Sequence, residues 1–159
     1  MTIINDPDFG KLEVNDLFDR GRPYEVEFFA SKYRINLCVR GIEAGGAIAD
    51  YQRAAFLQLE REKSRFFRET EDELMKYYSL VVEEERAALE EAADEKMPLI
   101  SGKNELSKIF EPTEVLINCV SEEEEIDFLF ECSWDLDLGL AVKFINGKFV
   151  KAGAQGDVI

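Results

Sequence analysis

The middle of the chain, from Asp50 to about Ala93, contains neither proline nor glycine and consists mostly of strong helix formers. Apolar side chains recur within it at helical spacing, which predicts an amphipathic helical segment over residues 50–93. Thr70-Glu-Asp-Glu73 resembles a capping box, so the segment is compatible with one long helix or with two helices. The apolar stripe consists of Leu59, Phe66, Leu74, Tyr78 and Val81.

Segments on both sides of this stretch alternate apolar and polar residues, a pattern typical of strands with one buried face. In the clearest of them, Tyr24, Val26 and Phe28 alternate with glutamates. Asn146-Gly147 lies between two such segments and supplies the positive φ angles of a tight hairpin turn. The predicted strands cover residues 9–14, 24–29, 32–40, 113–120, 126–132, 140–145 and 148–151.

These elements predict a single α+β domain over residues 1–159. We expect an antiparallel sheet built from the N- and C-terminal strands, with a long central helix, or two helices, packed on one face. An apolar share of 46 % is enough to form a substantial core. A helix lying across a sheet explains the aromatic stripe better than a coiled coil does, because the spacing is not a heptad repeat.

The charge of the chain limits the chemistry that it can perform. It carries 34 acidic and 19 basic residues and no histidine, for a net charge of −15. Without histidine, the Ser/His/Asp and Cys/His catalytic arrangements are excluded, and so is the commonest metal ligand. The negative sign opposes binding to nucleic acid, which rests on clustered lysine and arginine. We therefore expect a non-enzymatic protein that binds a basic partner. It is expected to need neither a cofactor nor a metal.

The cysteines and the apolar runs indicate the compartment. Cys38, Cys119 and Cys132 lie in apolar segments without a C-x-x-C pair, which is typical of free buried thiols. No apolar run approaches the roughly 20 residues of a membrane span. The N-terminus also lacks a basic region followed by an apolar stretch, as a secretion signal would have. The sequence predicts a cytoplasmic protein that does not contact a membrane.

Acidic residues are concentrated in particular segments. Residues 60–95 carry thirteen acidic against six basic side chains, and repulsion at this density lowers stability unless another benefit favours it. Rapid electrostatic docking to a basic protein is such a benefit. The predicted partner-binding residues are Glu122, Glu123, Glu124, Glu125, Asp135 and Asp137, with Glu83, Glu84 and Glu85 as further candidates.

Two other functions remain open from the residues alone. The segment Trp134–Asp137 could belong to a small carboxylate-based hydrolase or to a cation-binding or ligand-binding domain. Its calcium-loop character is partial, because Leu140 and Asn146 stand where an EF-hand has glycine and glutamate. Alternatively, the aromatic helix stripe could form the interface of a homodimer, which would make the chain a self-associating structural module.

From Cys132 onwards the chain reads C-S-W-D-L-D-L-G-L-A-V-K-F, then N-G, then V-K-A-G-A-Q-G-D. This end resembles a group of uncharacterised bacterial domains whose C-terminal hairpin reads C-x-W-D-x-E-H-G-L-G-V-x-F, followed by a turn with glycine and V-x-x-G-x-Q-D. The chain departs from that pattern at Asp137-Leu138, where the pattern has Glu-His. The matching residues are Cys132, Trp134, Asp135, Gly139, Leu140, Val142, Phe144, Gly147, Val150, Gly153, Gln155 and Asp157.

The resemblance implies an α+β domain without established enzymatic activity. Small acidic members of such groups look similar to immunity proteins, which neutralise bacterial toxins. The leading hypothesis is therefore a bacterial immunity protein or antitoxin that occludes a basic partner, such as a nuclease toxin. Charge reversal at Glu123 and Glu124 is then expected to slow association with that partner.

Overall fold

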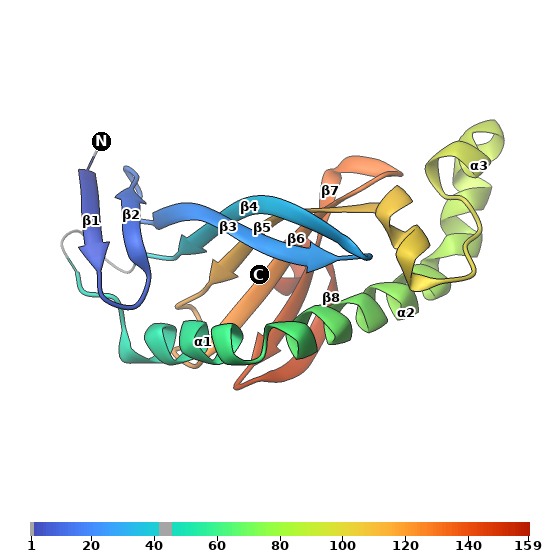
Figure 1. The fold of residues 1–159 in the computed structure, drawn as a ribbon. Coiled ribbons are helices and arrows are strands. Elements are labelled where there is room, and N and C mark those ends of the chain that lie inside the picture. The colour runs from blue at the N-terminus through green and yellow to red at the C-terminus, as the bar shows by residue number, and fades with distance from the viewer. Residues whose placement is uncertain (1, 42–45) are drawn as a thin grey trace.

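One sheet of eight strands forms the body of the molecule (Figure 1). The structure is a computed structural model that describes residues 2–41 and 46–159. The strands stand side by side in chain order, so each one pairs with its neighbours in the sequence. They are β1 (Thr2–Asp6), β2 (Gly10–Val14), β3 (Arg20–Phe28), β4 (Ser31–Val39), β5 (Phe110–Ile117), β6 (Glu125–Cys132), β7 (Asp135–Ile145) and β8 (Lys148–Ala154).

The sheet is mixed, which corrects the expected antiparallel sheet. Strands β4 and β5 pair in parallel, whereas every other neighbouring pair is antiparallel. The physical reason is the connection between β4 and β5, which passes through the helices and returns the chain to the same end of the sheet. The fold is also dominated by its sheet rather than by a central helix, and the sequence analysis did not predict β1.

The predicted helical segment 50–93 corresponds to two main helices that meet at a break. Helix α1 (Asp50–Arg61) and helix α2 (Lys63–Leu89) are separated by Glu62, whose φ of −123° and ψ of 29° are not helical. Thr70 lies inside α2, so the expected capping box does not mark the break. Among the described residues, no helix combines the length and apolarity needed to cross a membrane. The shorter helices are η1 (Glu90–Ala92), α3 (Ala93–Lys96), η2 (Lys103–Lys108) and α4 (Gln155–Val158).

The apolar stripe of the helices packs against the sheet. Leu59, Phe66 and Leu74 are fully buried, and Tyr78 is nearly so. The ring of Phe66 lies 5.1 Å from that of Phe144 on β7, an edge-to-face contact that adds to the stabilisation from burial. The stripe therefore belongs to the core of the chain itself.

The sheet curls around an aromatic core. Phe28 on β3 is separated from β6 by two intervening strands, which in a flat sheet would place β3 and β6 about 14 Å apart. Its ring nevertheless lies 5.9 Å from Phe128 and 5.2 Å from Phe130, both on β6. Phe67 of α2 contacts the same ring at 5.0 Å. Phe28 thus joins the N-terminal strands, the C-terminal strands and the helical layer.

Alternate residues of the strands point to the face of the sheet away from α1 and α2, here called the back face. Strand register places Cys38 of β4, Leu116 of β5, Asp127 of β6 and Lys143 of β7 in one row across this face. Cys38, Leu116 and Asp127 are buried, although no long helix covers them. The central strands are therefore buried on both faces, and the back-face row described here includes a buried acid, Asp127.

The turn between β3 and β4 requires two residues with left-handed backbone. The loop consists of Phe29 and Ala30, with φ angles of 55° and 61°, one residue earlier than the sequence indicates. The amide of Phe29 donates a hydrogen bond of 2.6 Å to Glu71 on α2, and its ring is buried. Tertiary contacts therefore hold a conformation that these residue types disfavour.

Replacing Ala30 with glycine is expected to raise the free energy of unfolding by about 1 kcal/mol, because glycine adopts positive φ without steric strain. Ala30 is exposed, so no packing is lost. Chemical denaturation provides the measurement. Ala87→Gly on the exposed side of α2 is the matched control and should lower stability by about 1 kcal/mol. Equal losses in both variants would contradict the left-handed turn.

The β1–β2 hairpin is fastened to α1 by an ion pair. Arg53 of α1 binds Asp6 at 2.7 Å and Asp8 at 2.9 Å. The hydrogen bond from Arg53 lowers the pKa of Asp6 to about 2, against the opposing effect of burial. This contact adds to the packing of the hairpin itself, because Phe9 and Leu12 are buried in the core and the ring of Phe9 stacks on that of Phe56 of α1 at 4.4 Å.

Candidate functional site

The end of α2 and the short helix after it form a hairpin that extends past the sheet (Figure 1). Glu83 and Glu84 are exposed there, and Glu85 is half-buried. Arg86 is turned inward: its guanidinium donates to the carbonyl oxygens of Ala93 and Met97 and pairs with Asp94 at 2.6 Å. The positive charge of this helix end is thereby used inside the hairpin, while the glutamates face solvent.

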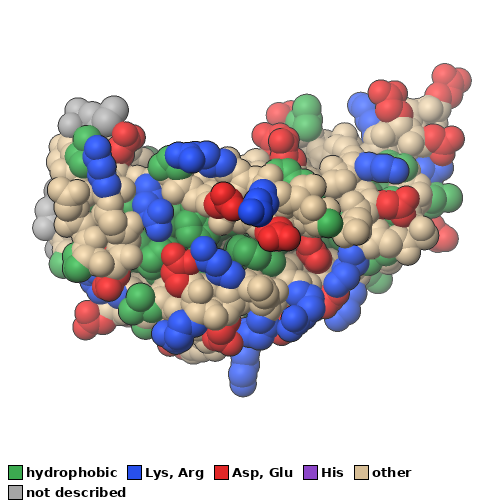
Figure 2. All heavy atoms as spheres, viewed as in Figure 1, with side chains coloured by type: hydrophobic (Ala, Val, Ile, Leu, Met, Phe, Trp, Pro, Cys, Tyr) green, Lys and Arg blue, Asp and Glu red, His purple; other side chains and the backbone are tan. Residues whose placement is uncertain are grey.

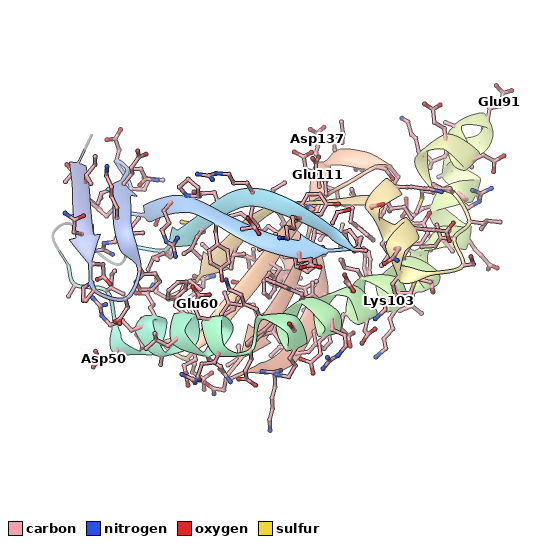
Figure 3. All side chains as sticks on the ribbon, viewed as in Figure 1. Asp50, Glu60, Glu91, Lys103, Glu111 and Asp137 are labelled. Atoms are coloured by element: carbon pink, nitrogen blue, oxygen red, sulfur yellow. The ribbon has the colours of Figure 1, made fainter. Side chains whose placement is uncertain are left out.

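The start of β7 lies against this helical hairpin. The hydroxyl of Ser133 donates a hydrogen bond to the carbonyl of Lys96 at the end of α3. Asp135 and Asp137 follow directly and are exposed, and Figure 3 shows Asp137 projecting outward from the sheet. The structure therefore brings the predicted residues of 83–85 and 135–137 to one end of the molecule.

We call this end the distal acidic surface. In Figure 2, acidic side chains gather at this end, whereas lysine and arginine side chains lie along the main helices and over the N-terminal strands, with a few at this end as well. Glu91 projects from its tip in Figure 3. Lys96 is exposed here as well, so the surface is not purely negative. Its exposed carboxylates are Glu83, Glu84, Glu90, Glu91, Asp94, Glu95, Asp135 and Asp137, of which Asp94 is paired with Arg86.

Large apolar side chains are exposed at the same end. Leu80 on α2, Leu99 after α3 and Leu136 at the start of β7 are 82 %, 74 % and 72 % exposed. Leu136 also lines a small hollow with Glu111. Exposed leucines next to charged residues are the usual composition of a protein-binding surface, in which the apolar side chains contribute affinity and the charged rim orients the partner.

The acidic turn 119–124 lies at the opposite end of β6 from Asp135 and Asp137. A strand of eight residues spans about 25 Å, so the sequence-predicted set does not form one surface. Glu122 and Glu123 are exposed and Glu124 is half-buried. The turn is tied to the β7–β8 turn through Asn146, whose side chain donates to Glu123 at 3.3 Å and whose amide donates to the carbonyl of Glu124.

Glu125 differs from the rest of the predicted set because it is only 1 % exposed. It is the first residue of β6 and faces Lys143 of β7, with 3.6 Å between Glu125 Oε2 and Lys143 Nζ. In this conformation it has no surface to offer a partner. Asp127, two residues further on the same face, is fully buried and accepts a hydrogen bond of 3.0 Å from Asn118.

These four residues, Asn118, Glu125, Asp127 and Lys143, form the buried polar cluster. Burial is the largest cause that raises the pKa of Asp127 to about 8, and its hydrogen bond with Glu125 acts in the same direction. Burial opposes ionisation of Glu125 too, but hydrogen bonds from Asp127 and Ser121 and the charge of Lys143 outweigh it and lower the pKa of Glu125. The two carboxyl groups are thus driven to opposite protonation states.

Asn118, Asp127 and Lys143 were not among the site residues predicted from the sequence. A signal was present, because Leu116, Leu129 and Ala141 are apolar residues at strand positions that alternation assigns to the outward face. Strands buried on both faces show such continuous apolar runs. These residues predict a covered back face, and any acid between them is then expected to be buried.

A wide hollow of about 1030 Å³ lies over β2–β5 on the back face. Side chains of both signs line it, among them Lys11, Glu13 and Arg34. Cys38 also lines it, but burial raises the pKa of that thiol to about 12. A thiol with this pKa stays protonated near neutrality and is a poor nucleophile. The hollow therefore offers mixed-charge contacts without an activated thiol.

The segment Trp134–Asp137 has the features of a local turn. Trp134 is packed against Tyr78 and Phe110 at 5.9 and 5.8 Å, and the amide of Asp137 donates to the carboxylate of Asp135. In the described part of the chain, no group of three or more cysteine, aspartate and glutamate side chains could hold a metal ion. The carboxylate of Asp135 therefore satisfies a backbone amide at the start of β7.

Most residues that carry the C-terminal resemblance have packing roles. Gly139 has a φ of +60°, and a Cβ atom there would lie 2.6 Å from the side-chain nitrogen of Gln155. A Cβ atom at Gly153 would lie 3.7 Å from the side chain of Val158 of α4, an ordinary packing distance. The turn residues Asn146 and Gly147 adopt the positive φ angles expected of them. The motif thus specifies how α4 docks on β7 and β8 and how the β7–β8 turn closes. Leu140, Val142 and Phe144 complete it as fully buried core residues.

No curated protein and no solved structure matches the chain. A family model does match, over residues 8–159, and it describes a domain of unknown function, DUF6985. The match extends far beyond the last thirty residues on which the sequence resemblance rested. The chain therefore belongs to the DUF6985 family of domains of unknown function.

Proposed function

We propose that the chain is a non-enzymatic, protein-binding domain of the bacterial cytoplasm, which docks a basic protein partner through the distal acidic surface. An immunity protein or antitoxin is the class that fits this description. The observation that carries the proposal is the combination, at one end of the fold, of exposed carboxylates with Leu80, Leu99 and Leu136. The net charge of −15 gives the molecule a negative field that favours encounters with a basic partner, and the exposed carboxylates near the contact contribute most to it.

The local chemistry supports selection of a cationic partner. Because Arg86 is satisfied within the helical hairpin, it does not offset the glutamates beside it. Exposed ion pairs add little affinity by themselves, so the leucines would contribute most of the binding free energy and the acids would raise the association rate. This division of roles makes the proposal testable through kinetics.

Geometry gives less support to the two alternatives. A carboxylate hydrolase or cation site at 134–137 would require sheltered acids, whereas Asp135 and Asp137 are exposed. A homodimer through the aromatic stripe would require a free stripe, whereas Phe66 and Tyr78 are packed against the sheet. We therefore retain the basic-partner proposal alone.

Two variants that each remove three negative charges separate the distal acidic surface from a general effect of charge. The distal variant combines Glu84→Gln, Asp135→Asn and Asp137→Asn, and the turn variant combines Glu122→Gln, Glu123→Gln and Glu124→Gln. If the adjacent reading frame encodes a basic protein, that protein is the probe, and stopped-flow kinetics at low and high salt provide the measurement. We expect the distal variant to associate roughly tenfold more slowly and with a weaker salt dependence.

The turn variant is expected to change the association rate by less than about threefold, because long-range charge alone has a modest effect. Equal slowing of both variants would reduce the proposal to a net-charge effect. A larger effect of the turn variant would restore Glu123 and Glu124 as the contact. An adjacent reading frame whose basic product does not bind the wild-type chain would overturn the proposal.

A further inference from the structure

The buried polar cluster contains two acids and, in the described part of the chain, one cation in contact with them. Glu125 and Asp127 are 1 % and 0 % exposed. From β7 the facing charge is Lys143, and from the residue directly after β5 the facing side chain is Asn118, which is neutral. Further along the same row of strand partners, β4 contributes Cys38 and β8 contributes Lys151. The ammonium group of Lys151 donates a hydrogen bond to the carbonyl oxygen of Asp157. Ser121 reaches Glu125 from the turn.

Two ionised carboxylates in this place would lack both charge balance and hydrogen-bond donors. Among the described residues, no group donates a hydrogen bond to Asp127 Oδ1 or to Glu125 Oε2. A buried acceptor without a donor is destabilising by about as much as a lost hydrogen bond. One proton held between the two carboxyl groups supplies the missing donor and, with Lys143, brings the net charge of the cluster to zero.

The proton belongs on Asp127 rather than on Glu125. Lys143 lies beside Glu125 and stabilises its ionised form, whereas Asp127 is the more deeply buried acid and receives only the amide of Asn118. A protonated Asp127 can donate to Glu125 while it still accepts from Asn118. The raised pKa of Asp127 and the lowered pKa of Glu125 agree with this assignment.

The cluster also holds both ends of the acidic turn 119–124. At one end, the side-chain oxygen of Asn118 accepts the amides of Cys119 and Val120 at 2.8 and 3.4 Å. At the other end is Glu125, whose carbonyl accepts the amide of Asn118 at 3.2 Å. The carboxyl pair therefore bridges the residues from which the turn leaves and re-enters the sheet.

We propose that Glu125 and Asp127 share one proton, and that this proton clamps the acidic turn 119–124 onto the sheet. Loss of the proton places two negative charges beside one another, and Glu125, at the end of its strand, is the group that can move towards solvent. The turn then loosens. The clamp is a property of the fold and does not depend on the proposed basic partner.

The sign of the pH dependence follows from the folded-state pKa of Asp127. In the unfolded chain an aspartate ionises near pH 4, whereas in the folded chain Asp127 keeps its proton up to about pH 8. Between these values the folded state binds more protons than the unfolded state, so stability falls as pH rises. For one retained proton, the unfolding temperature should fall by roughly 5–10 °C between pH 5 and pH 7.

The test compares the wild-type chain with Asp127→Asn and Glu125→Gln. Asparagine reproduces the protonated aspartate, since it can accept from Asn118 and donate to Glu125. Glutamine at 125 donates to Asp127 and lets it ionise. Both variants should lose the contribution of Asp127 to the pH dependence, and Asp127→Asn should unfold at a higher temperature than the wild type at pH 7. Glu131→Gln, an exposed change on the same strand, is the control and should keep the wild-type slope.

Two spectroscopic measurements report on the proton and on the turn. Infrared spectra of the wild type at pH 7 should contain a protonated-carboxyl band that is absent from Asp127→Asn. Backbone ¹⁵N relaxation should show residues 119–124 gaining mobility above pH 8 in the wild type and not in Asp127→Asn. Absence of the band, or a slope in Asp127→Asn equal to that in Glu131→Gln, would overturn the shared proton. Equal turn mobility in both proteins at high pH would overturn the clamp.

Discussion

Replacing Lys143 with methionine is expected to lower the free energy of unfolding by about 3–5 kcal/mol at pH 7. Methionine keeps most of the aliphatic length of lysine but removes the cation 3.6 Å from Glu125. The ionised carboxylate is then buried without a counter-charge, which is far more destabilising than the absence of the whole pair. Chemical denaturation at pH 7 measures the loss.

Two comparisons attribute this loss to the buried charge. Lys148→Met removes an exposed lysine from β8 and should cost less than about 1 kcal/mol. Adding Glu125→Gln to Lys143→Met should recover a large part of the stability, because the uncompensated charge is gone. The loss in Lys143→Met should also shrink at pH 5, where Glu125 can take up a proton. A loss no larger than that of Lys148→Met would contradict the described cluster.

Replacing Phe28 with alanine is expected to destabilise the fold by about 3–5 kcal/mol, the usual range for a buried phenylalanine. Phe28 is fully buried and contacts three aromatic rings on α2 and β6: those of Phe67, Phe128 and Phe130. The cavity would open where the curled sheet closes over its core, so neighbouring side chains could not easily refill it. Urea denaturation measures the loss, with Phe28→Leu available if the alanine variant does not fold.

The matched control for Phe28 is Phe149→Ala on β8. Phe149 is 37 % exposed, and its ring contacts that of Phe144 at 6.2 Å. Phe149→Ala should therefore lower the free energy of unfolding by about 1 kcal/mol, as expected for a half-exposed side chain. A Phe28→Ala variant as stable as Phe149→Ala would show that the strands do not curl around this ring.

Local sequence patterns predicted the local structure of this chain. Alternation at Tyr24, Val26 and Phe28 marks the buried face of β3, and Asn146-Gly147 supplies the turn after β7. The stretch without proline or glycine corresponds to α1 and α2. These features depend on neighbouring residues alone, which is why the sequence is sufficient to reveal them.

Features that depend on distant residues were not predictable in the same way. The parallel pairing of β4 with β5 joins residues such as Leu37 and Val115 across the helical connection, and no local pattern encodes it. Strand β1 is held by Arg53, far along the chain from Asp6. Glu125 was assigned to an exposed acidic run because its neighbours in sequence are glutamates, whereas its neighbours in space are Asp127 and Lys143.

In the candidate site, too, some features follow from the local sequence and others only from the fold. Glu83, Glu84, Asp135 and Asp137 were identified from the sequence because exposed acids need only a hydrophilic local context. The contact of Ser133 with Lys96 brings these four acids to one end of the fold. The length of β6 keeps the turn 119–124 away from that end. The sequence therefore supplied candidate residues, and the fold divided them into a distal surface, a separate turn and a buried pair.

Mapping the contact surface by NMR tests the central claim most directly. The ¹⁵N-labelled chain is titrated with the product of the adjacent reading frame, if that product is basic, and backbone amide shifts are followed residue by residue. We expect shift changes concentrated in residues 80–99 and 133–138, with the turn 119–124 unaffected. Changes confined to the turn, or to the hollow over β2–β5 on the back face, would contradict it.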